Sequence, residues 1–408
     1  MDVEIQINNS TGANARFITW APSSCRIRVT NPSGVTSPTA TVRLTATSTA
    51  TGGQLVFRRG TTGPFTNSLT LQLAINGTSA QFFIAGRFGR PSIDNGDITI
   101  EARRGTTLVG SVPVMVRVRK NANNLTPGER DRFVSAMAQL NNQGAGRFVD
   151  FRDMHVELAL GQSHGHPAFL PWHRAYLLDL ERELQAIDPS VSLPYWRFDQ
   201  PAPNIFTRDF FGVADQFGTV EWSPANPLQF WRTDSMLGIN RLPLFPTNTR
   251  PPGLLNETQT LLDRGSQYAS FRDMEGNPHG FAHTSFDGFI SDPATAPKDP
   301  LFFLLHCNVD RLWAKWQRRF NRFDPAQAAS YQNNPSAAPG RKLDDTMWPW
   351  NGLTGGTRPS TAPGGPLAAS ACVTAPGPQP RVRDTIDYQG KVAALSTLGF
   401  DYDDNPFL

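Results

Sequence analysis

Cysteine and histidine are both scarce in this chain, which has three cysteines and seven histidines among 408 residues. The cysteines, Cys25, Cys307 and Cys372, are odd in number, lie far apart and include no Cys-x-x-Cys pair. These spacings indicate neither a disulfide scaffold nor a zinc site built on thiolates, so we expect reduced thiols.

The chain also lacks an excess of charge of one sign, with 38 Lys and Arg against 35 Asp and Glu and a formal net charge of +3. This balance argues against nucleic acid or an anionic membrane as a partner. No apolar run reaches the roughly 18 residues of a transmembrane helix, and the first residues lack the basic and apolar regions of a leader. We therefore expect a soluble, unexported (cytoplasmic) protein as the sequence stands, and a leader removed from a longer precursor would leave secretion open.

Residues 1–119 contain no histidine and no lysine, and their apolar residues alternate with polar ones. The alternation is clear over 69–75 and 112–118, and turn sequences such as Asn31-Pro32-Ser33-Gly34 separate such runs. This pattern is typical of short strands buried on one face and predicts an immunoglobulin-like β-sandwich. We expect this domain to support homo-oligomerisation or to control access to a site elsewhere.

The pattern changes at Lys120. Thr126 and Glu129 have the spacing of a capping box with a proline after the cap, and apolar residues then recur at helical spacing. We predict a mainly helical domain over 120–325. The stretch 354–380 holds six prolines and five glycines, so 326–408 is predicted to be an extension over the surface, whose closing segment packs on the helical domain. The chain is thus predicted to be multidomain α+β.

All seven histidines lie between His155 and His306, on or beside helices expected at about 150–160, 172–187, 279–290 and 300–320. His279 and His283 are four residues apart, which places two imidazoles roughly 6 Å apart on one helical face and suits two ligands of one ion. Ligation by histidine alone favours zinc or copper over magnesium, calcium or di-iron, which need more oxygen ligands. Two sets of three ligands would leave one histidine over.

Two segments around these histidines resemble the motifs of a known family. The segment 164–174, with the run Phe-Leu-Pro-Trp-His-Arg, resembles the first copper motif of tyrosinases and other type-3 copper polyphenol oxidases, of bacterial type. The segments around 279–283 and 299–313 resemble the second copper motif. The resemblance covers 120–325, together with Val382-Arg383-Asp384 and with Phe400-Asp401-Tyr402, which is similar to the family's closing tyrosine motif.

The resemblance implies two copper ions, dioxygen and a small phenol as substrates, and a four-helix bundle that carries the metal pair. It assigns three histidines to each copper and leaves His166 as a bystander. The implied ligands are His155, His164 and His173 for one ion and His279, His283 and His306 for the other.

Three positions near these ligands set further expectations. Some relatives join a cysteine to the second ligand by a thioether, but Gln162 stands two residues before His164, so we predict no thioether. Glu275 lies near the place where some members keep a glutamate that holds a water by the second copper, and we predict that it helps to take a phenolic proton. Gly280 stands where strong monophenolases of the family often carry asparagine, so we predict o-diphenol oxidation to o-quinones with only weak monophenol hydroxylation.

Other residues of the second motif are predicted to act from behind the ligands. Phe302 matches a family phenylalanine packed between the metal-binding helices, and Asp310, one turn beyond His306, is expected to orient a ligand or a neighbouring helix. Asn308 is expected beside it, whereas Cys307 points away from His306 and is predicted to be buried packing.

Alternative functions remain open at this point. A tyrosinase-type monophenol monooxygenase or an o-aminophenol oxidase would use the same ligands, and so would an oxygen carrier of haemocyanin type. A zinc hydrolase would instead use His164 and His166 as a pair, with Asp153 or Asp310 as a carboxylate ligand and an open water position.

Overall fold

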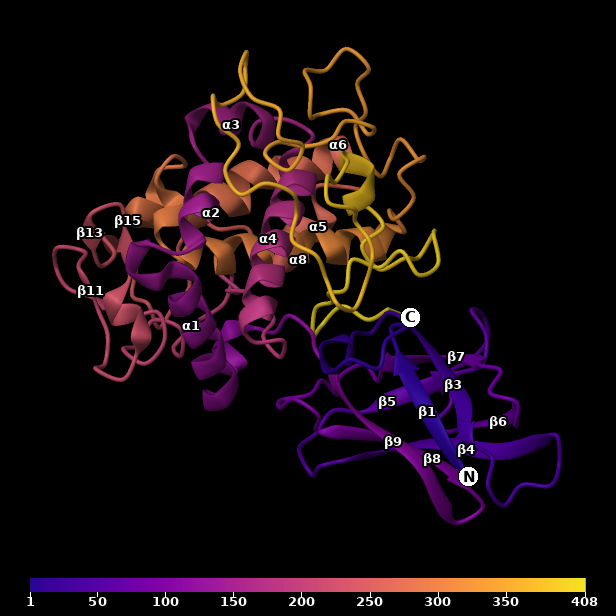
Figure 1. Cartoon of the computed structure of the whole chain (residues 1–408). Coiled ribbons are helices and arrows are strands. Elements are labelled where there is room, and N and C mark those ends of the chain that lie inside the picture. The colour runs from indigo at the N-terminus through magenta and orange to yellow at the C-terminus, as the bar shows by residue number, and fades with distance from the viewer. Residues whose placement is uncertain (408) are drawn as a thin grey trace. The chain divides into compact units, whose positions relative to one another are not determined.

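The computed structural model describes residues 1–407, apart from the side chain of Glu157. The chain forms two compact units (Figure 1), each made of several stretches of sequence. The strand unit comprises Met1–Val118, Ser370–Ala375 and Gln389–Leu408, and the helical unit comprises Arg119–Ala369 and Pro376–Tyr388. A strand-rich N-terminal region followed by a helical region is therefore what the sequence predicted.

The strand unit contains two sheets. Four antiparallel strands form the first sheet in the order β1-β3-β7-β5. Five strands form the second in the order β2-β9-β8-β4-β6, and only the pair β2 and β9 is parallel. The bounds are β1 (Asp2–Ile7), β2 (Phe17–Ile18), β3 (Ser23–Asn31), β4 (Thr39–Ser48), β5 (Leu55–Arg58), β6 (Leu69–Ala74), β7 (Ala80–Gly86), β8 (Ile98–Arg104) and β9 (Thr107–Val116).

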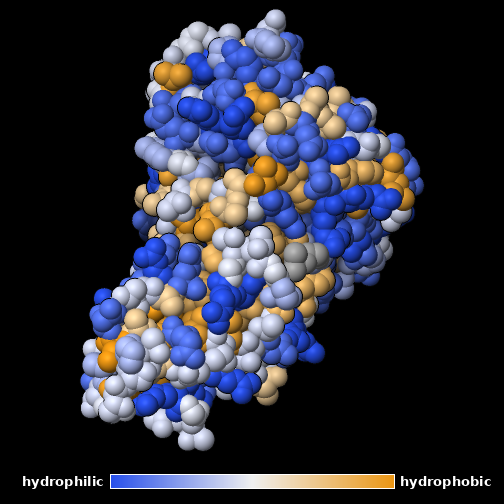
Figure 2. Space-filling model, turned by 90° about the vertical axis from the view of Figure 1, so that its right-hand side faces the viewer, coloured by the Kyte–Doolittle hydropathy of each residue, from blue (hydrophilic) through white to orange (hydrophobic). Residues whose placement is uncertain are grey.

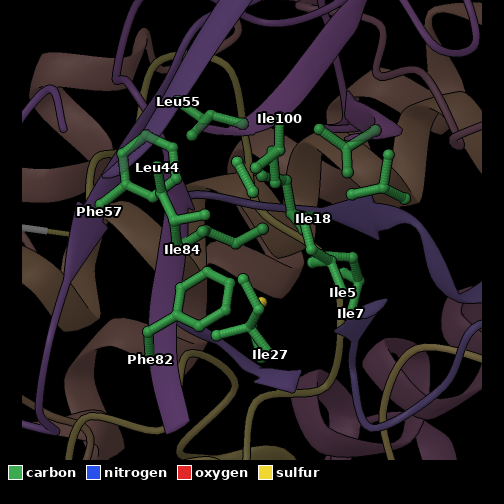
Figure 3. Packing of buried hydrophobic residues seen from close by; sticks show 14 of the residues in the cluster. Ile5, Ile7, Ile18, Ile27, Leu44, Leu55, Phe57, Phe82, Ile84 and Ile100 are labelled. Atoms are coloured by element: carbon green, nitrogen blue, oxygen red, sulfur yellow. The ribbon is translucent and has the colours of Figure 1, made fainter. Parts of the chain in front are cut away.

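Alternate residues of both sheets meet in one hydrophobic core (Figure 3). Ile27 and Ile84 of the first sheet and Leu44 and Ile100 of the second are all fully buried in this cluster. Because side chains of a strand point alternately to its two faces, the period of two in the sequence places one apolar row per strand in this core.

The helical unit has its longest helices at the positions of the histidine motifs. Thr126 caps the first α-helix of the unit, α1, in the predicted capping box, because its side chain accepts from the Glu129 amide and the Glu129 side chain accepts from the Thr126 amide. The α-helices are α1 (Pro127–Asn141), α2 (Phe148–Met154), α3 (Glu157–Ser163), α4 (Phe169–Ile187), α5 (Glu257–Leu262), α6 (Tyr268–Phe271), α7 (Phe281–Thr284) and α8 (Leu301–Phe320).

Short elements connect these helices. The small antiparallel pairs are β10 (Val213–Ala214) with β11 (Val220–Glu221), β12 (Arg232–Thr233) with β13 (Met236–Leu237), and β14 (Arg241–Pro243) with β15 (Phe286–Gly288). Single helical turns occur at Ala13–Ala15 of the strand unit, and in the helical unit at Ala122–Asn124, Asn142–Gly144, Pro227–Phe230, Arg272–Glu275, Gly276–Gly280, Phe289–Ser291, Ala296–Lys298 and Val382–Thr385.

A buried network of charges joins α4 to α8. Asp310 of α8 accepts hydrogen bonds from Arg174 of α4 at 2.6 Å and from Arg119 at 3.2 Å. Arg119 also pairs with Glu181 of α4 at 2.7 Å, and all four side chains are almost fully buried. Removing one partner of such a network would leave an uncompensated buried charge, so Asp310 fixes how the two helices pack.

The closing segment is divided between the two units. Residues 376–388 belong to the helical unit, but 389–408 group with the strands. Trp20 donates its indole N–H to the Tyr402 carbonyl at 2.8 Å, and the Ala21 amide donates to Asp401 at 3.0 Å. Because these hydrogen bonds satisfy buried polar groups beside β2, the tyrosine motif is part of the strand unit.

Hydrophilic residues dominate the face shown in Figure 2, and hydrophobic residues are interspersed among them. Large apolar side chains are exposed at single positions such as Phe217, which is 74% exposed, as is normal for a folded protein. Among the residues that the structure describes, no helix has the length and apolar character needed to cross a membrane.

Candidate metal centre

The first three predicted ligands converge from three helices. His155 follows α2, His164 follows α3 and His173 lies in the first half of α4. The Nε2 atom of His155 lies 2.9 Å from that of His164 and 3.4 Å from that of His173. The sequence predicted one helix over 150–160, but the backbone leaves helical geometry at His155. This break turns the imidazole of His155 toward the other two.

The other three ligands form a second group. His306 lies in α8, and its Nε2 is 3.3 Å from that of His279 and 3.1 Å from that of His283. The helix predicted over 279–290 is not formed: a π-type turn over Gly276–Gly280 carries His279, and the short helix α7 carries His283. Asn277 has extended geometry inside this turn (φ −137°, ψ 119°), because the proline that follows it disfavours the helical region.

Backbone carbonyls orient most of the imidazoles. Four rings donate Nδ1–H to a carbonyl oxygen at 2.7–2.8 Å, which leaves Nε2 without a proton and its lone pair free. Unprotonated nitrogens about 3 Å apart repel one another, and a metal cation bound between them would remove this repulsion. The donor and acceptor pairs are His155 with Pro293, His173 with Phe169, His279 with Glu275 and His283 with Ile290.

Burial favours the neutral form of five of the six grouped imidazoles. Desolvation is the main cause that lowers the pKa of His283 to about 4, and the pKa of the other buried rings also falls well below its usual value because of burial and neighbouring imidazoles. Neutral imidazoles bind metal without first losing a proton. The ligand atoms of each triad lie within 4.8 Å of one another, and each triad consists of histidine alone. This donor set fits copper and gives no oxygen ligand for magnesium or calcium.

His164 is held differently from the other ligands. Its Nδ1 lies 3.2 Å from Oε1 of Glu275, and the same oxygen accepts a hydrogen bond from the Gly165 amide at 2.7 Å. Glu275 therefore lies behind a ligand of the first triad, although the sequence associated it with the second metal. Gly280 has ordinary helical geometry, and a Cβ there would lie 3.4 Å from the Glu275 carbonyl, which is normal contact.

Phe302 lies between the two triads. It is fully buried, its ring stacks on that of His306 with centroids 4.1 Å apart, and its edge meets His155 at 5.0 Å. Phe169 packs in the same way, with its centroid 4.7 Å from His173 and 4.9 Å from His279. The two phenyl rings therefore form apolar walls around the ligands.

The remaining predicted residues lie outside both triads. Asn308 accepts from Arg311 at 3.1 Å, and Cys307 is buried with its thiol 3.5 Å from the Leu193 carbonyl. The half-buried His166 is not among the grouped ligands, and burial together with the charge of Arg341 lowers its pKa.

The carboxylates that a zinc hydrolase would use are engaged elsewhere. Asp153 pairs with Arg152 at 2.7 Å, and Asp310 pairs with Arg174 in the network between α4 and α8. Within residues 1–407, neither carboxylate joins a histidine triad.

The sequence did not indicate which backbone carbonyls orient the imidazole rings. The Pro293 carbonyl lies 138 residues from His155, and nothing in the spacing of either residue relates them. The carbonyls of Phe169 and Glu275 are each four residues before the ring that they orient. The contact between His173 and the Phe169 carbonyl could have been predicted from a helix that includes both residues, because they lie four positions apart in α4.

The chain was compared with known proteins. A family described as "Common central domain of tyrosinase" matches residues 145–319, a range that includes both triads. A tyrosinase of Streptomyces glaucescens is 34% identical over 57% of this chain and 92% of its own length. The chain belongs to the tyrosinase family.

Two more distant similarities were also found. Grixazone synthase of Streptomyces griseus is 31% identical over 50% of this chain and 85% of its own length. A structure of deoxygenated hemocyanin from Rapana thomasiana is 21% identical, with a TM-score of 0.48, and the match covers 71% of this chain and 70% of that one.

Membership of the tyrosinase family makes the protein a type-3 copper oxidoreductase with a dicopper centre. The two histidine triads are the groups that can form this centre. Residues 1–118 of the strand unit lie outside the range that matches the tyrosinase family.

Proposed function

We propose that this type-3 copper phenol oxidase oxidises small o-diphenols to o-quinones with dioxygen and hydroxylates monophenols only weakly. The observation that carries the proposal is the convergence of imidazole Nε2 atoms in two triads, one of His155, His164 and His173 and the other of His279, His283 and His306. When bound there, a copper pair supplies the exchange of two electrons between the diphenol and dioxygen.

The protein's own residues hold the metal ligands and limit the access of water. The backbone carbonyls behind the imidazoles fix the rings, so the ligands need little rearrangement when copper binds. The buried rings of Phe302 and Phe169 pack against the imidazoles and keep water from the inner side of the pair. The side chain of His164 is 20% exposed, so we expect a phenol to approach from the side of this residue.

Two features favour diphenols over monophenols. Gly280 carries no side chain that would orient a water beside the second triad. Oε1 of Glu275 is engaged by His164 and Gly165, which leaves Oε2 as the atom able to accept a phenolic proton. A carboxylate with one oxygen held in this way has less freedom to reach the hydroxyl proton of a bound monophenol.

The proposal is tested with the copper-loaded full chain and three substrates that share a para methyl group: 4-methylcatechol, 4-methylphenol and 2-amino-4-methylphenol. We expect two coppers per chain and a kcat/KM for the catechol at least about tenfold above that for the monophenol, which corresponds to about 1.4 kcal/mol. Equal values for catechol and monophenol would refute the diphenol preference. A faster reaction with the aminophenol would instead identify an o-aminophenol oxidase.

The same assay separates the other functions. An oxygen carrier would bind copper without forming quinone from catechol. A zinc hydrolase would bind one zinc ion per chain in metal analysis after expression with both metals supplied. Either result would overturn the proposal.

We also propose the finer features of the architecture. An immunoglobulin-like sandwich is supported by two largely antiparallel sheets around one core. A four-helix bundle is supported by ligands on or beside α2, α3, α4 and α8 and by the packing of α4 on α8.

We also propose that the chain forms homo-oligomers through the strand unit. Sedimentation of the full chain tests this proposal, and a purely monomeric species at micromolar concentration would refute it.

A further inference from the structure

A segment of the Pro-rich and Gly-rich C-terminal region lies against the first triad's helices. We call residues 339–348 the strap. Residues 380–382, further along the chain, anchor the strap. The Met347 amide donates to the Pro380 carbonyl and the Val382 amide donates to the Asp345 carbonyl, each at 3.1 Å. Met347 and Trp348 are almost fully buried. The strap is therefore a fixed part of the helical unit.

Both ends of the strap bind the side-chain amide of Gln162. The Trp348 amide donates to Oε1 of Gln162 at 2.8 Å, and Nε2 of Gln162 donates to the Pro339 carbonyl at 3.2 Å. Arg341 of the strap also donates to the carbonyl of Gly161. Gln162 is only 6% exposed, and a buried amide with its donor and its acceptor both satisfied has one favoured position.

Trp348 relates Gln162 to the next ligand helix. Its carbonyl accepts the indole N–H of Trp172 at 2.7 Å, and Trp172 immediately precedes His173. Gln162 stands two residues before His164. The amide and the carbonyl of one strap residue thus bind a neighbour of each of two metal ligands.

His164 depends on such support more than the other ligands do. Its backbone is extended (φ −130°, ψ 152°) just after α3 ends, and its ring is 20% exposed. Its Nδ1 binds a carboxylate side chain, whereas the four rings oriented by carbonyls are held by the main chain. The position of His164 is therefore set by the residues on either side: Gly165, bound by Glu275, and Gln162, bound by the strap.

We propose that Gln162, held by the strap, is a positioning residue that keeps His164 in the first triad. In some type-3 copper relatives a thioether bond restrains the corresponding histidine, and here the hydrogen bonds of Gln162 would restrain His164 without a covalent bond. This inference rests on the proposed dicopper function, since it concerns how firmly one of two coppers is held. Groups behind metal ligands typically change metal affinity by about 10–100-fold.

The first test is Gln162→Met, which keeps the length of the side chain and removes both hydrogen bonds. The matched control is Gln139→Met, at an exposed position of α1. Each copper-loaded chain is mixed with EDTA, and copper release is followed over time. We expect one of the two coppers to leave at least about tenfold faster from Gln162→Met than from the wild type or Gln139→Met. Release of both coppers at the wild-type rate, or equal acceleration of both, would overturn the inference.

A second pair of variants acts on the strap itself. Gly340 has a φ of +85°, and a Cβ there would overlap the side-chain amide of Gln162. Gly355 has a φ of +80°, with nothing within 4 Å of an added Cβ. Alanine carries the same backbone strain at both positions, so the difference between Gly340→Ala and Gly355→Ala reports on Gln162. We expect faster loss of one copper only from Gly340→Ala, and equal release from both variants would overturn the inference.

The outcomes separate this inference from the proposed function. A wild-type chain that binds no copper or does not oxidise 4-methylcatechol would refute the proposed function. A wild-type chain with two coppers and diphenol oxidation, together with unchanged release from Gln162→Met and Gly340→Ala, would refute only the role of Gln162. Far-ultraviolet circular dichroism of the copper-free variants confirms that each is folded.

Discussion

The imidazole of His173 lies parallel to that of His306, with ring centroids 4.3 Å apart and an interplanar angle of 10°. The two rings belong to different triads and to the two helices, α4 and α8, that the network around Asp310 joins. The triads are thus in direct contact through one stacked pair of ligands. Such contact favours chemistry in which two metal ions act on one substrate.

Replacing one of the stacked ligands should empty one site. We expect His306→Ala to retain about one copper per chain and to lose diphenol oxidation, because two imidazoles hold copper far less firmly than three. The control is His166→Ala, which removes the histidine outside the triads. It should retain two coppers and most of the activity. Metal analysis after dialysis checks both, and loss of copper from His166→Ala would contradict the assignment of ligands.

Gly280→Asn should change the preference between substrates without disturbing the fold. A Cβ fits at this position, and an amide side chain would be able to orient a water beside the second triad. We expect the ratio of 4-methylphenol to 4-methylcatechol turnover to rise several-fold. Gly276→Asn, in the same π-type turn and with open space for a Cβ, is the control. A ratio that is unchanged in Gly280→Asn would show that Gly280 does not determine the preference.

Phe302→Ala should destabilise the helical unit strongly. The ring is fully buried against His306 and His155, and deletion of a buried phenylalanine typically costs about 3–5 kcal/mol. Phe217→Ala removes a ring that is 74% exposed and should change the free energy of unfolding by less than about 0.5 kcal/mol. Urea unfolding of the copper-free chains measures both, and similar values for the two would refute the role of Phe302 in packing.

Asp179 should make stability depend on pH between about 4 and 6. Burial raises the pKa of this carboxyl to about 6, although it accepts hydrogen bonds from Trp350 and Ala368, each at 2.8 Å. Because its pKa is higher in the folded than in the unfolded chain, its contribution favours folding at low pH and is lost as the pH rises through 6. This difference in pKa between the folded and unfolded chain corresponds to a change of at most about 3 kcal/mol in the free energy of unfolding.

The pH effect is measured against Asp179→Asn. The free energy of unfolding of the copper-free wild type, minus that of the variant, should fall by about 2 kcal/mol between pH 4 and pH 7. Asp209→Asn, at an exposed position, should show no such change. A difference that rises with pH would contradict the predicted sign.

Much of the fold follows from local sequence patterns. The alternation over 69–75 and 112–118 corresponds to β6 and β9, and the capping box at Thr126 begins α1. These features are predictable because each depends on neighbours in the chain. The π-type turn before α7 was missed, although the proline after Asn277 is a local signal against a helix there.

The residues that position the site were less predictable. Six histidines group in two triads, but the contact between Gln162 and Trp348 joins residues 186 positions apart. Proline and glycine in 354–380 predicted irregular structure over the surface, whereas Ala368 in that stretch binds the buried Asp179. The proline and glycine content of a segment indicates that it lacks helices and strands. It does not show which buried polar groups the segment will bind by hydrogen bonds.

The hydrogen bond between Trp20 and Tyr402 joins residues that are 382 positions apart. A ribosome makes the strands β1 to β9 before residues 119–388, yet the Tyr402 carbonyl that accepts from Trp20 is made after those residues. The strand unit is therefore completed only after the whole copper-binding unit has left the ribosome. During synthesis, the nascent N-terminal strands must persist as an unfinished domain for most of the translation of the chain.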